Sequence, residues 1–380
     1  MNRDFVTTRS AGLERLAEMV PGCGLDYAAR RNLDTGPLGE ATTTGLSPYL
    51  RRRLLLEQEV VAAALAKHGA GKATKFVEEV FWRSYFKGFL ETHPGIWTNY
   101  LDLVAQAKDA SGTSSGGRRA YEAAVAGRTG IDGFDDWSRE LVETGWLHNH
   151  VRMWFASIWI FTLGLPWALG ADFFLRHLVD GDPASNTLSW RWVAGLHTRG
   201  KPYAARAENI RRYTDGRYSP TGLNENPIAL QEDEYEPAIT PGGVGECPTG
   251  EVALLLHLDD LHPESLPLGS ARVVRLGGLV AHAPDATERV RRADEDAMAD
   301  GLARAAAYFD CPATRVDAGW AGTLPVVTAW APVGPSADAL PAGVSRVRRQ
   351  WDDLTWPRAT RGYFQMKTAI PAILDKALQP

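Results

Sequence analysis

The sequence has few cysteines and no long apolar segment, and both absences narrow the class of protein. Its 380 residues include three cysteines, Cys23, Cys247 and Cys311, which lie far apart and form no Cys-x-x-Cys pair. This argues against a disulfide framework or a thiolate metal site. The N-terminal residues lack the apolar core of a signal peptide, and the apolar segment 153–165 is too short to span a membrane. We therefore expect a cytoplasmic protein.

The glycine-rich loops with which many proteins bind nucleotide phosphates are also missing. No Gly-x-Gly-x-x-Gly and no Gly-x-x-x-x-Gly-Lys-Ser motif follows an expected strand, and no internal repeat is visible. The composition is otherwise that of an ordinary globular protein, with 44% hydrophobic and 23% charged residues. Any nucleotide cofactor must therefore be bound by another kind of site.

The net charge of −5 is unevenly distributed along the chain. Residues 1–230 contain 27 Lys and Arg against 25 Asp and Glu, whereas residues 231–380 contain 14 against 21. Basic clusters at 51–53 and 206–217 could face a nucleic-acid backbone even on an acidic protein. Solvated helix faces and loop edges are the alternative explanation of both clusters.

The apolar pattern divides the chain into a helical region and a region of alternating strands and helices. Helices are expected at 48–68, 74–92, from 118, at 137–144 and at 147–163, with a flexible loop at 109–117. Strands are expected at 252–258, 271–280 and 324–331, with helices at 286–309, from 336 and from 368. The predicted fold class is multidomain α and α/β, in which a helical domain at 1–230, a linker at 231–250 and a small α/β domain at 251–380 follow one another.

Two polar segments in the helical region carry most of the functional information. Residues 144–153 are T-G-W-L-H-N-H-V-R-M, and D-G-D-P-A-S-N follows at 180–186. Asn149 and Arg152 share roughly one helix face because positions three apart meet on a helix. A buried Arg152 needs a carboxylate, and Asp180 is the leading candidate for this partner.

A third polar segment precedes an expected helix. Residues 42–50, T-T-T-G-L-S-P-Y-L, offer hydroxyls and backbone amides just before the helix begins. Such an arrangement suits a phosphate or a pyrophosphate, since helix N-termini bind anions.

These segments belong to five motifs whose order resembles that of the photolyase and cryptochrome family. The motifs are T-x-x-L-S-P-Y-L at 43–50, E-x-x-W-R at 79–83, T-G-x-x-H-N-x-x-R-M at 144–153, D-G-D-x-A-x-N at 180–186 and W-x-W at 190–192. The resemblance covers roughly residues 25–220. Five separate motifs in this order are improbable by accident.

The resemblance implies a helical domain that binds FAD in a bent conformation. The cofactor residues that it implies are Tyr27, Thr43, Thr44, Gly45, Leu46, Ser47, Arg83, Asn149, Arg152, Asp180, Asp182 and Asn186. Those from Tyr27 to Ser47 would hold the diphosphate, and Asn186 would face the flavin N5. An amide suits N5 because it can either donate or accept a hydrogen bond. The pair of Arg152 and Asp180 would balance charge near a reduced anionic ring.

The activity that the resemblance implies is light-driven splitting of cyclobutane pyrimidine dimers in DNA by electron transfer from excited reduced FAD. The partner would be UV-damaged DNA, either double-stranded or single-stranded. The dimer would be flipped out of the strand into the cavity. The residues implied to contact the dimer are Glu79, Trp82, Asn149, Met153 and Trp192. For Trp82 and Trp192, ordinary packing in the core or at its rim is the alternative.

Electron supply to the flavin departs from the family pattern. Trp190 and Trp167 correspond to the two inner tryptophans of the family's electron relay, whereas residues 98–136 contain no tryptophan for the outer position. Trp154 and Trp159 on the expected apolar helix would either replace it or serve only in packing.

The region at 251–380 is a second departure. Family members usually begin with an α/β antenna domain, but the flavin motifs start almost at once here, and no catalytic motif is recognised beyond residue 250. The sequence H-L-D-D-L-H at 257–262 could hold a metal, yet adjacent strand residues point to opposite faces, so no metal is predicted. The segment 351–364, rich in aromatic and Arg residues, would pack on the helical region or on a protein partner.

Two functions therefore remain open. The first is a photolyase-like lyase that splits dimers, which the five retained dimer-contacting residues favour. The second is a cryptochrome-like blue-light receptor, or another flavoprotein without repair activity. His150, where repair enzymes often have Arg, and the acidic region at 251–380 keep the second function open.

Overall fold

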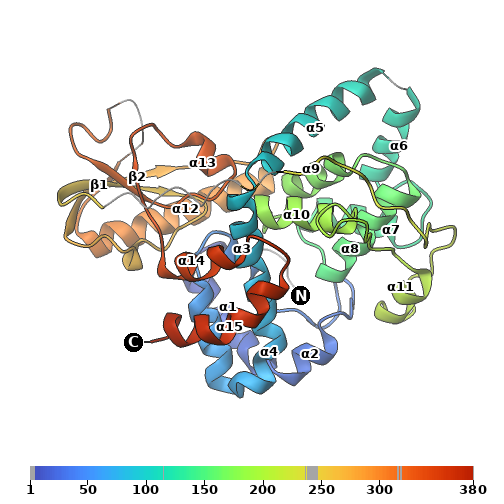
Figure 1. Cartoon of the computed structure of the whole chain (residues 1–380), viewed down its shortest axis with the longest axis horizontal. Coiled ribbons are helices and arrows are strands. Elements are labelled where there is room, and N and C mark those ends of the chain that lie inside the picture. Colours follow the sequence, from blue (N-terminus) through green and yellow to red (C-terminus); the bar gives the residue numbers. More distant parts are fainter. Residues whose placement is uncertain are drawn as a thin grey trace.

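A body of helices and a parallel five-stranded sheet lie side by side in the computed structural model (Figure 1). The structure describes residues 5–113, 115–235, 237, 247–314, 316 and 319–379. Residues 236 and 238–246 of the expected linker lie outside this description. Within the described ranges, none of the helices combines the length and the apolar character needed to cross a membrane.

The body contains the helices that carry the five motifs. They are α1 (Arg9–Met19), α2 (Leu25–Arg30), α3 (Ser47–Arg51), α4 (Glu57–Thr92), α5 (Gly95–Thr113), α6 (Ser115–Val125), α7 (Phe134–Thr144), α8 (Asn149–Ser157), α9 (Trp167–His177), α10 (Pro183–Val193) and α11 (Ala207–Tyr213). Helix α8 continues into a π-helical turn at Ile158–Thr162. The two helices expected at 48–68 and 74–92 are instead the short α3 and the long α4, which bends at Gly69 with a φ of 72°. Glycine adopts this conformation without a steric penalty.

The prediction of a flexible loop at 109–117 is wrong. Helix α5 continues to Thr113 and α6 begins at Ser115, and the two helices form a projecting hairpin (Figure 1). The expectation rested on Gly and Ser, which have low helix propensity, but propensity is a weak signal that packing between neighbouring helices overrides.

The sheet confirms the expected parallel pairing. Its strands are β1 (Gly250–His257), β2 (Ala271–Leu279), β3 (Ala313–Thr314), β4 (Val326–Ala329) and β5 (Ser345–Val347). They lie in the order β3-β2-β1-β4-β5, and each neighbouring pair is parallel. The buried run from Val252 to Leu256 is continuous rather than alternating, as in strands covered on both faces. The remaining helices of this region are α12 (Glu288–Phe309), α13 (Pro335–Ala339), α14 (Gln350–Thr355) and α15 (Phe364–Ala377).

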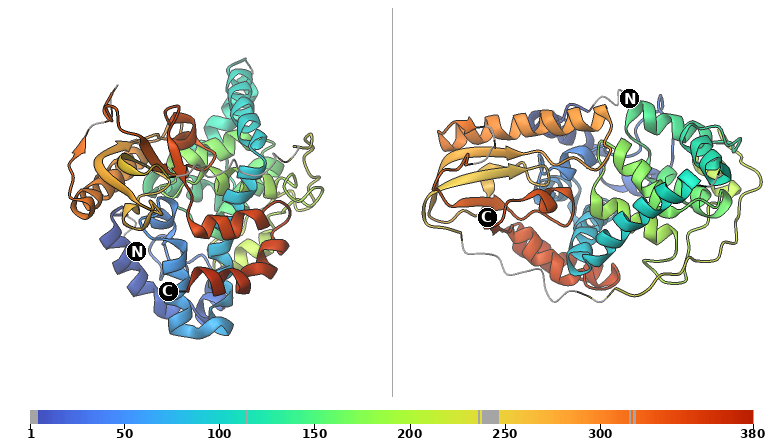
Figure 2. Two further views of the ribbon diagram at one scale, coloured as in Figure 1. Left: turned by 60° about the vertical axis from the view of Figure 1, so that its left-hand side comes forward. Right: turned by 90° about the horizontal axis from the view of Figure 1, so that it is seen from above.

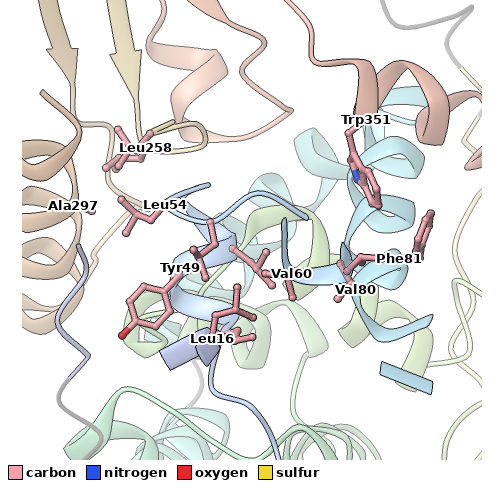
Figure 3. Close-up of a cluster of buried hydrophobic side chains, with 14 of the residues drawn as sticks. Leu16, Tyr49, Leu54, Val60, Val80, Phe81, Leu258, Ala297 and Trp351 are labelled. Atoms are coloured by element: carbon pink, nitrogen blue, oxygen red, sulfur yellow. The ribbon is translucent and has the colours of Figure 1, made fainter. Parts of the chain in front are cut away.

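One hydrophobic core connects the body with the sheet. Leu54, which follows α3, belongs to the same buried cluster as Leu258 at the end of β1 and Ala297 of α12 (Figure 3). A view from above places α12 along one face of the sheet and the C-terminal helices on its other side, towards α4 (Figure 2). There Trp351 of α14 donates a hydrogen bond of 2.8 Å to Ser84 of α4. The aromatic segment 351–364 thus packs on the helical body.

Candidate functional site

The ion pair expected between Arg152 and Asp180 is present. Nη2 of Arg152 on α8 lies 3.0 and 2.9 Å from the two carboxylate oxygens of Asp180, which is located between α9 and α10. Ser47 Oγ at the start of α3 donates a third hydrogen bond, of 2.6 Å, to Asp180 Oδ2. Three of the five motifs therefore meet at one carboxylate.

Asp182 connects a fourth motif to the same turn. Its Oδ1 accepts a hydrogen bond of 2.9 Å from the Ser185 amide and so caps α10, while its Oδ2 lies 3.0 Å from Arg83 Nη1 and 2.9 Å from Lys87 Nζ. Burial opposes ionisation of Asp182, but the charges of Lys87, Arg83 and Arg51 outweigh burial and hold its pKa well below the usual range. Lys87 was not identified from the sequence, although it lies one helical turn after Arg83.

The other residues expected to contact the flavin ring or the dimer lie on α8 and α10. Asn186 is buried on α10, and its Nδ2 donates a hydrogen bond of 2.8 Å to the Ala171 carbonyl. Asn149 at the start of α8 is exposed, and Met153 and Trp192 are half-buried. Trp192 packs against Tyr203 with ring centroids 5.5 Å apart.

The segment expected to hold a diphosphate borders a small, partly open pocket. Thr43 and Gly45 line this pocket together with Trp146. Arg15 lies beside it, since its Nε donates a hydrogen bond of 2.7 Å to the Thr44 carbonyl. The Thr43 hydroxyl, backbone groups and the nearby Arg15 guanidinium could bind a phosphate group. The carboxylates of Asp34 and Glu40 also line the pocket, and each is paired with an arginine.

Four residues of the expected diphosphate set do not line the pocket, namely Tyr27, Thr44, Leu46 and Ser47. Tyr27 on α2 packs edge-on against Phe76 of α4 with centroids 5.3 Å apart, and Leu46 is buried in the core shared with the sheet. Their side chains are not among those that line the pocket.

Glu79 and Trp82 of α4 are already in contact with other parts of the chain. Glu79 Oε1 lies 2.5 Å from Arg31 Nη1, and burial raises the Glu79 pKa although the Arg31 charge opposes that rise. Trp82 stacks on Tyr363, which precedes α15, with centroids 3.6 Å apart and ring planes 12° from parallel. Sequence reasoning missed this contact, for which the aromatic segment at 351–364 was the only signal.

The expected electron-transfer tryptophans have different neighbours. Trp190 lies beside Trp159, with centroids 6.2 Å apart, and Trp159 lies 5.9 Å from Tyr121 in an edge-to-face arrangement. Trp167 packs instead against Tyr100, with centroids 5.9 Å apart. Trp154 stacks on Trp137 in the interior of the body. Of the two candidate substitutes, Trp159 is therefore the one that contacts Trp190.

Both explanations of the basic cluster at 51–53 are wrong, because its guanidinium groups are buried in ion pairs. Arg52 is 2% exposed and its Nη2 lies 2.6 Å from Asp294. Arg53 Nη2 lies 2.5 Å from Asp352, and Arg51 Nη1 lies 2.8 Å from Asp259. No local pattern could indicate these carboxylates, because each lies more than 200 positions from its arginine.

The candidate metal residues at 257–262 take part in the same pairing. Asp260 lies 2.6 Å from Arg349 Nε and 3.4 Å from Arg53 Nη1, and His257 Nε2 lies 3.0 Å from the Ala329 carbonyl. His262 is 8% exposed and borders the acidic groups of Glu59 and Glu264. Among the described residues, no group of three or more His, Cys, Asp or Glu could hold a metal ion.

Comparisons with known proteins find matches to the helical region. Residues 76–218 match the family model described as the FAD binding domain of DNA photolyase. Over 216 residues the chain is 36% identical to a deoxyribodipyrimidine photo-lyase of Streptomyces griseus, which covers 53% of this chain and 44% of that relative. The chain thus spans less than half the length of this relative.

Solved structures give similar coverage. A class III photolyase from Agrobacterium tumefaciens is 26% identical over 55% of this chain and 43% of that structure, with a TM-score of 0.46. A cryptochrome from Synechocystis is 24% identical over the same shares, also with a TM-score of 0.46. The family match confirms that the cofactor of the helical region is FAD. Residues 76–218 thus match the FAD-binding domain of DNA photolyase, and about half of the chain is similar in sequence to deoxyribodipyrimidine photo-lyases.

Proposed function

We propose that this protein uses FAD and blue light to split cyclobutane pyrimidine dimers in UV-damaged DNA. The observation that carries the proposal is the arrangement of α4, which bears Glu79, Trp82 and Arg83 within five residues. Arg83 is paired with Asp182 in the turn assigned to the cofactor, whereas Glu79 and Trp82 are of the types that contact a flipped base. One helix thus connects the residues for the cofactor with the residues for the dimer.

The cofactor side is formed by Ser47, Arg152, Asp180, Asp182 and Asn186. When bound and reduced, FAD supplies the electron that splits the dimer under blue light and takes it back afterwards. Because Asn186 Nδ2 is committed to the Ala171 carbonyl, its Oδ1 is the atom left to accept a hydrogen bond from a protonated ring nitrogen. The guanidinium of Arg152 balances negative charge on the ring.

The phosphates of FAD would be bound at the pocket beside α3. Thr43 supplies a hydroxyl, Gly45 allows close approach of the backbone, and Arg15, held by the Thr44 carbonyl, supplies a positive charge. This assignment leaves Tyr27 and Leu46 with a supporting role in the core.

On the dimer side we assign Glu79 and Trp82 of α4 to the dimer, and Asn149, Met153 and Trp192 to the same side as the resemblance implies. The indole of Trp82 offers a flat surface on which a pyrimidine stacks. The raised pKa of Glu79 increases its protonated fraction, and a protonated carboxyl can donate a hydrogen bond to a pyrimidine carbonyl. Arg31 must release Glu79 before this can happen, because it now pairs with the carboxylate.

Dimer repair by substituted proteins tests the proposal. An oligonucleotide with one dimer is illuminated with blue light in the presence of reduced protein, and remaining dimers are counted by chromatography. Trp82→Ala should slow repair about 5- to 150-fold, because stacking of a base on an aromatic ring contributes about 1–3 kcal/mol. Glu79→Ala should slow it as well, whereas Tyr308→Ala, which alters an exposed ring of α12, should not. Equal rates in all four proteins would contradict the proposal.

A cryptochrome-like receptor is the second candidate, and the stacking of Tyr363 on Trp82 favours it. Both principal dimer-contacting residues already have partners within the chain. In a receptor, light would change the contact between segment 351–364 and α4 without any repair. Intact dimers, together with light-dependent hydrogen exchange at residues 359–367, would support this function and contradict repair.

A further inference from the structure

Two consecutive arginines hold the backbone of the turn that contains Asp180 and Asp182. Arg51 Nε donates a hydrogen bond of 2.7 Å to the Gly181 carbonyl, and Arg52 Nη1 donates one of 2.8 Å to the Val179 carbonyl. Both arginines lie at the end of α3 and are buried. The conformation of the turn therefore depends on where these two guanidinium groups are fixed.

Carboxylates of the α/β region fix the same guanidinium groups from the other side. Asp259, just after β1, accepts a hydrogen bond of 2.8 Å from Arg51 Nη1. Asp294 of α12 accepts two from Arg52, of 2.9 Å from Nε and 2.6 Å from Nη2. Each arginine thus bridges one carboxylate of the α/β region and one carbonyl of the turn.

A lysine forms a third bridge to the same turn. Lys87 Nζ lies 3.4 Å from Asp259 and 2.9 Å from Asp182. Asp259 therefore acts on the turn by two routes, through the Gly181 carbonyl and through the Asp182 carboxylate.

Burial makes these bridges strong and makes the loss of either carboxylate costly. Asp259 is 4% exposed and Asp294 is 3% exposed, so salt and water screen their charges weakly. Burial opposes ionisation of Asp259, but the charges of Arg51 and Lys87 keep its pKa well below the usual range. Removal of either carboxylate leaves a buried guanidinium without its partner, and such a group must shift to find another.

The position of Asp259 in the sheet supports a functional role. The strand order reverses between β1 and β4, and in open parallel sheets ligands bind at the carboxyl ends of the strands at this point. Here the loop after β1 presents Asp259 to Arg51 instead of to a small ligand.

We propose that Asp259 and Asp294 are positioning residues for the FAD site, which fix the orientation of Asp180 and Asp182 through Arg51 and Arg52. The inference rests on the proposed placement of FAD beside these two carboxylates. It assigns to the α/β region a direct part in the geometry of the cofactor site, although no residue of that region belongs to the five motifs.

Two variants of the 380-residue chain test the inference. Asp259→Asn and Asp294→Asn remove a charge with little change of shape, and Asp353→Asn is the matched control because Asp353 pairs with Arg348 near the surface of the same region. Three quantities are measured: hydrogen exchange at residues 178–186 without FAD, the FAD dissociation constant, and the circular dichroism of bound flavin. Both test variants should speed exchange in the turn, weaken FAD binding at least about tenfold and change the flavin spectrum, and the control should do none of these.

Unchanged exchange and FAD affinity in both test variants would overturn the inference. A loosened turn with unchanged FAD affinity would overturn it too, since the turn would then not serve the cofactor. If the Asn variants do not fold, Arg51→Lys replaces them. Lysine keeps the charge beside Asp259 but has no second nitrogen to donate to the Gly181 carbonyl. Failure of dimer repair in a wild-type protein that binds FAD would remove the proposed function and leave this test intact.

Discussion

The cofactor side and the dimer side of the site are stabilised by different interactions. On the cofactor side, Asp180 and Asp182 are buried and each contacts at least two polar or charged side chains. On the dimer side, Trp82 is half-buried against the ring of Tyr363, and the ion pair of Glu79 with Arg31 is about a quarter exposed. Buried charges therefore stabilise the cofactor side, whereas a partly exposed ion pair and an aromatic stack stabilise the dimer side.

This difference indicates which side can move. Breaking a buried ion pair costs about 3–5 kcal/mol because a charge remains without a partner. Separating an aromatic pair costs about 0.5–1.5 kcal/mol beyond the area it buries. We therefore expect the cofactor side to keep its shape while the dimer side opens to admit DNA, with Tyr363 leaving Trp82.

The largest effect is expected from removing Asp182. Asp182→Ala leaves Arg83 and Lys87 without their shared carboxylate and uncaps α10, so the free energy of unfolding should fall by about 3–5 kcal/mol. Urea denaturation measures this loss, and FAD should be released. Asp353→Ala is the control, with an expected loss below about 1 kcal/mol. A similar loss in both variants would mean that the cofactor side does not depend on buried charge.

A smaller effect on the free energy of unfolding is expected when the pH is lowered. The pKa of Asp259 is lower in the folded protein than in the unfolded chain, so its contribution to stability is present above about pH 4 and is lost as the pH falls towards the folded value. Asp259→Asn should therefore reduce the slope of unfolding free energy against pH by up to about 1.4 kcal/mol per pH unit below pH 4. Urea denaturation at stepped pH values gives this slope. Parallel curves for the variant and the wild type would contradict the prediction.

Removing the aromatic stack should cost still less stability and should help DNA binding. Tyr363→Leu keeps an apolar side chain but no ring, so stability should fall by about 0.5–1.5 kcal/mol. The same energy no longer opposes opening, and affinity for an oligonucleotide with a dimer should rise about 2- to 12-fold. Fluorescence anisotropy measures the affinity, with Phe364→Leu, an exposed neighbour, as control. Unchanged or weaker binding would show that Tyr363 does not cover the dimer side.

The smallest effect on stability is expected from substitution of the tryptophans proposed to carry electrons to the flavin. Trp190→Phe and Trp159→Phe retain an aromatic ring at positions whose rings are in contact. Photoreduction of bound FAD with an external thiol as reductant should be blocked in the first and slowed in the second, while repair by chemically reduced protein survives in both. Visible spectra under illumination follow the reduction. If Trp167→Phe blocks photoreduction and Trp159→Phe does not, electrons travel through Trp167 instead.

The parts of the site that could be predicted from sequence are those with local signals. Arg152 and Asp180 could be paired because helix spacing places Arg152 on the inner face and a buried charge needs a partner. The parallel strands β1 and β2 followed from apolar runs of the right length. The helical hairpin of α5 and α6 was missed because its Gly and Ser residues have low helix propensity.

Contacts between distant residues could not be predicted. Arg52 meets Asp294 across 242 positions and Tyr363 meets Trp82 across 281, and no local pattern marks either pair. A cluster of three arginines has the same sequence pattern whether it faces solvent or lies buried among carboxylates. The difference arises because the loop after β1, α12 and α14 bring carboxylates to the end of α3 in the folded chain.

Dimer repair by wild-type protein whose flavin has been reduced before illumination is the most direct measurement of the central claim. Reduction beforehand removes any dependence on the electron path, and an undamaged oligonucleotide and a dark sample complete the design. We predict that dimers disappear under blue light and persist in the dark. Dimers that stay intact under light, in protein that carries fully reduced FAD, would contradict the repair function.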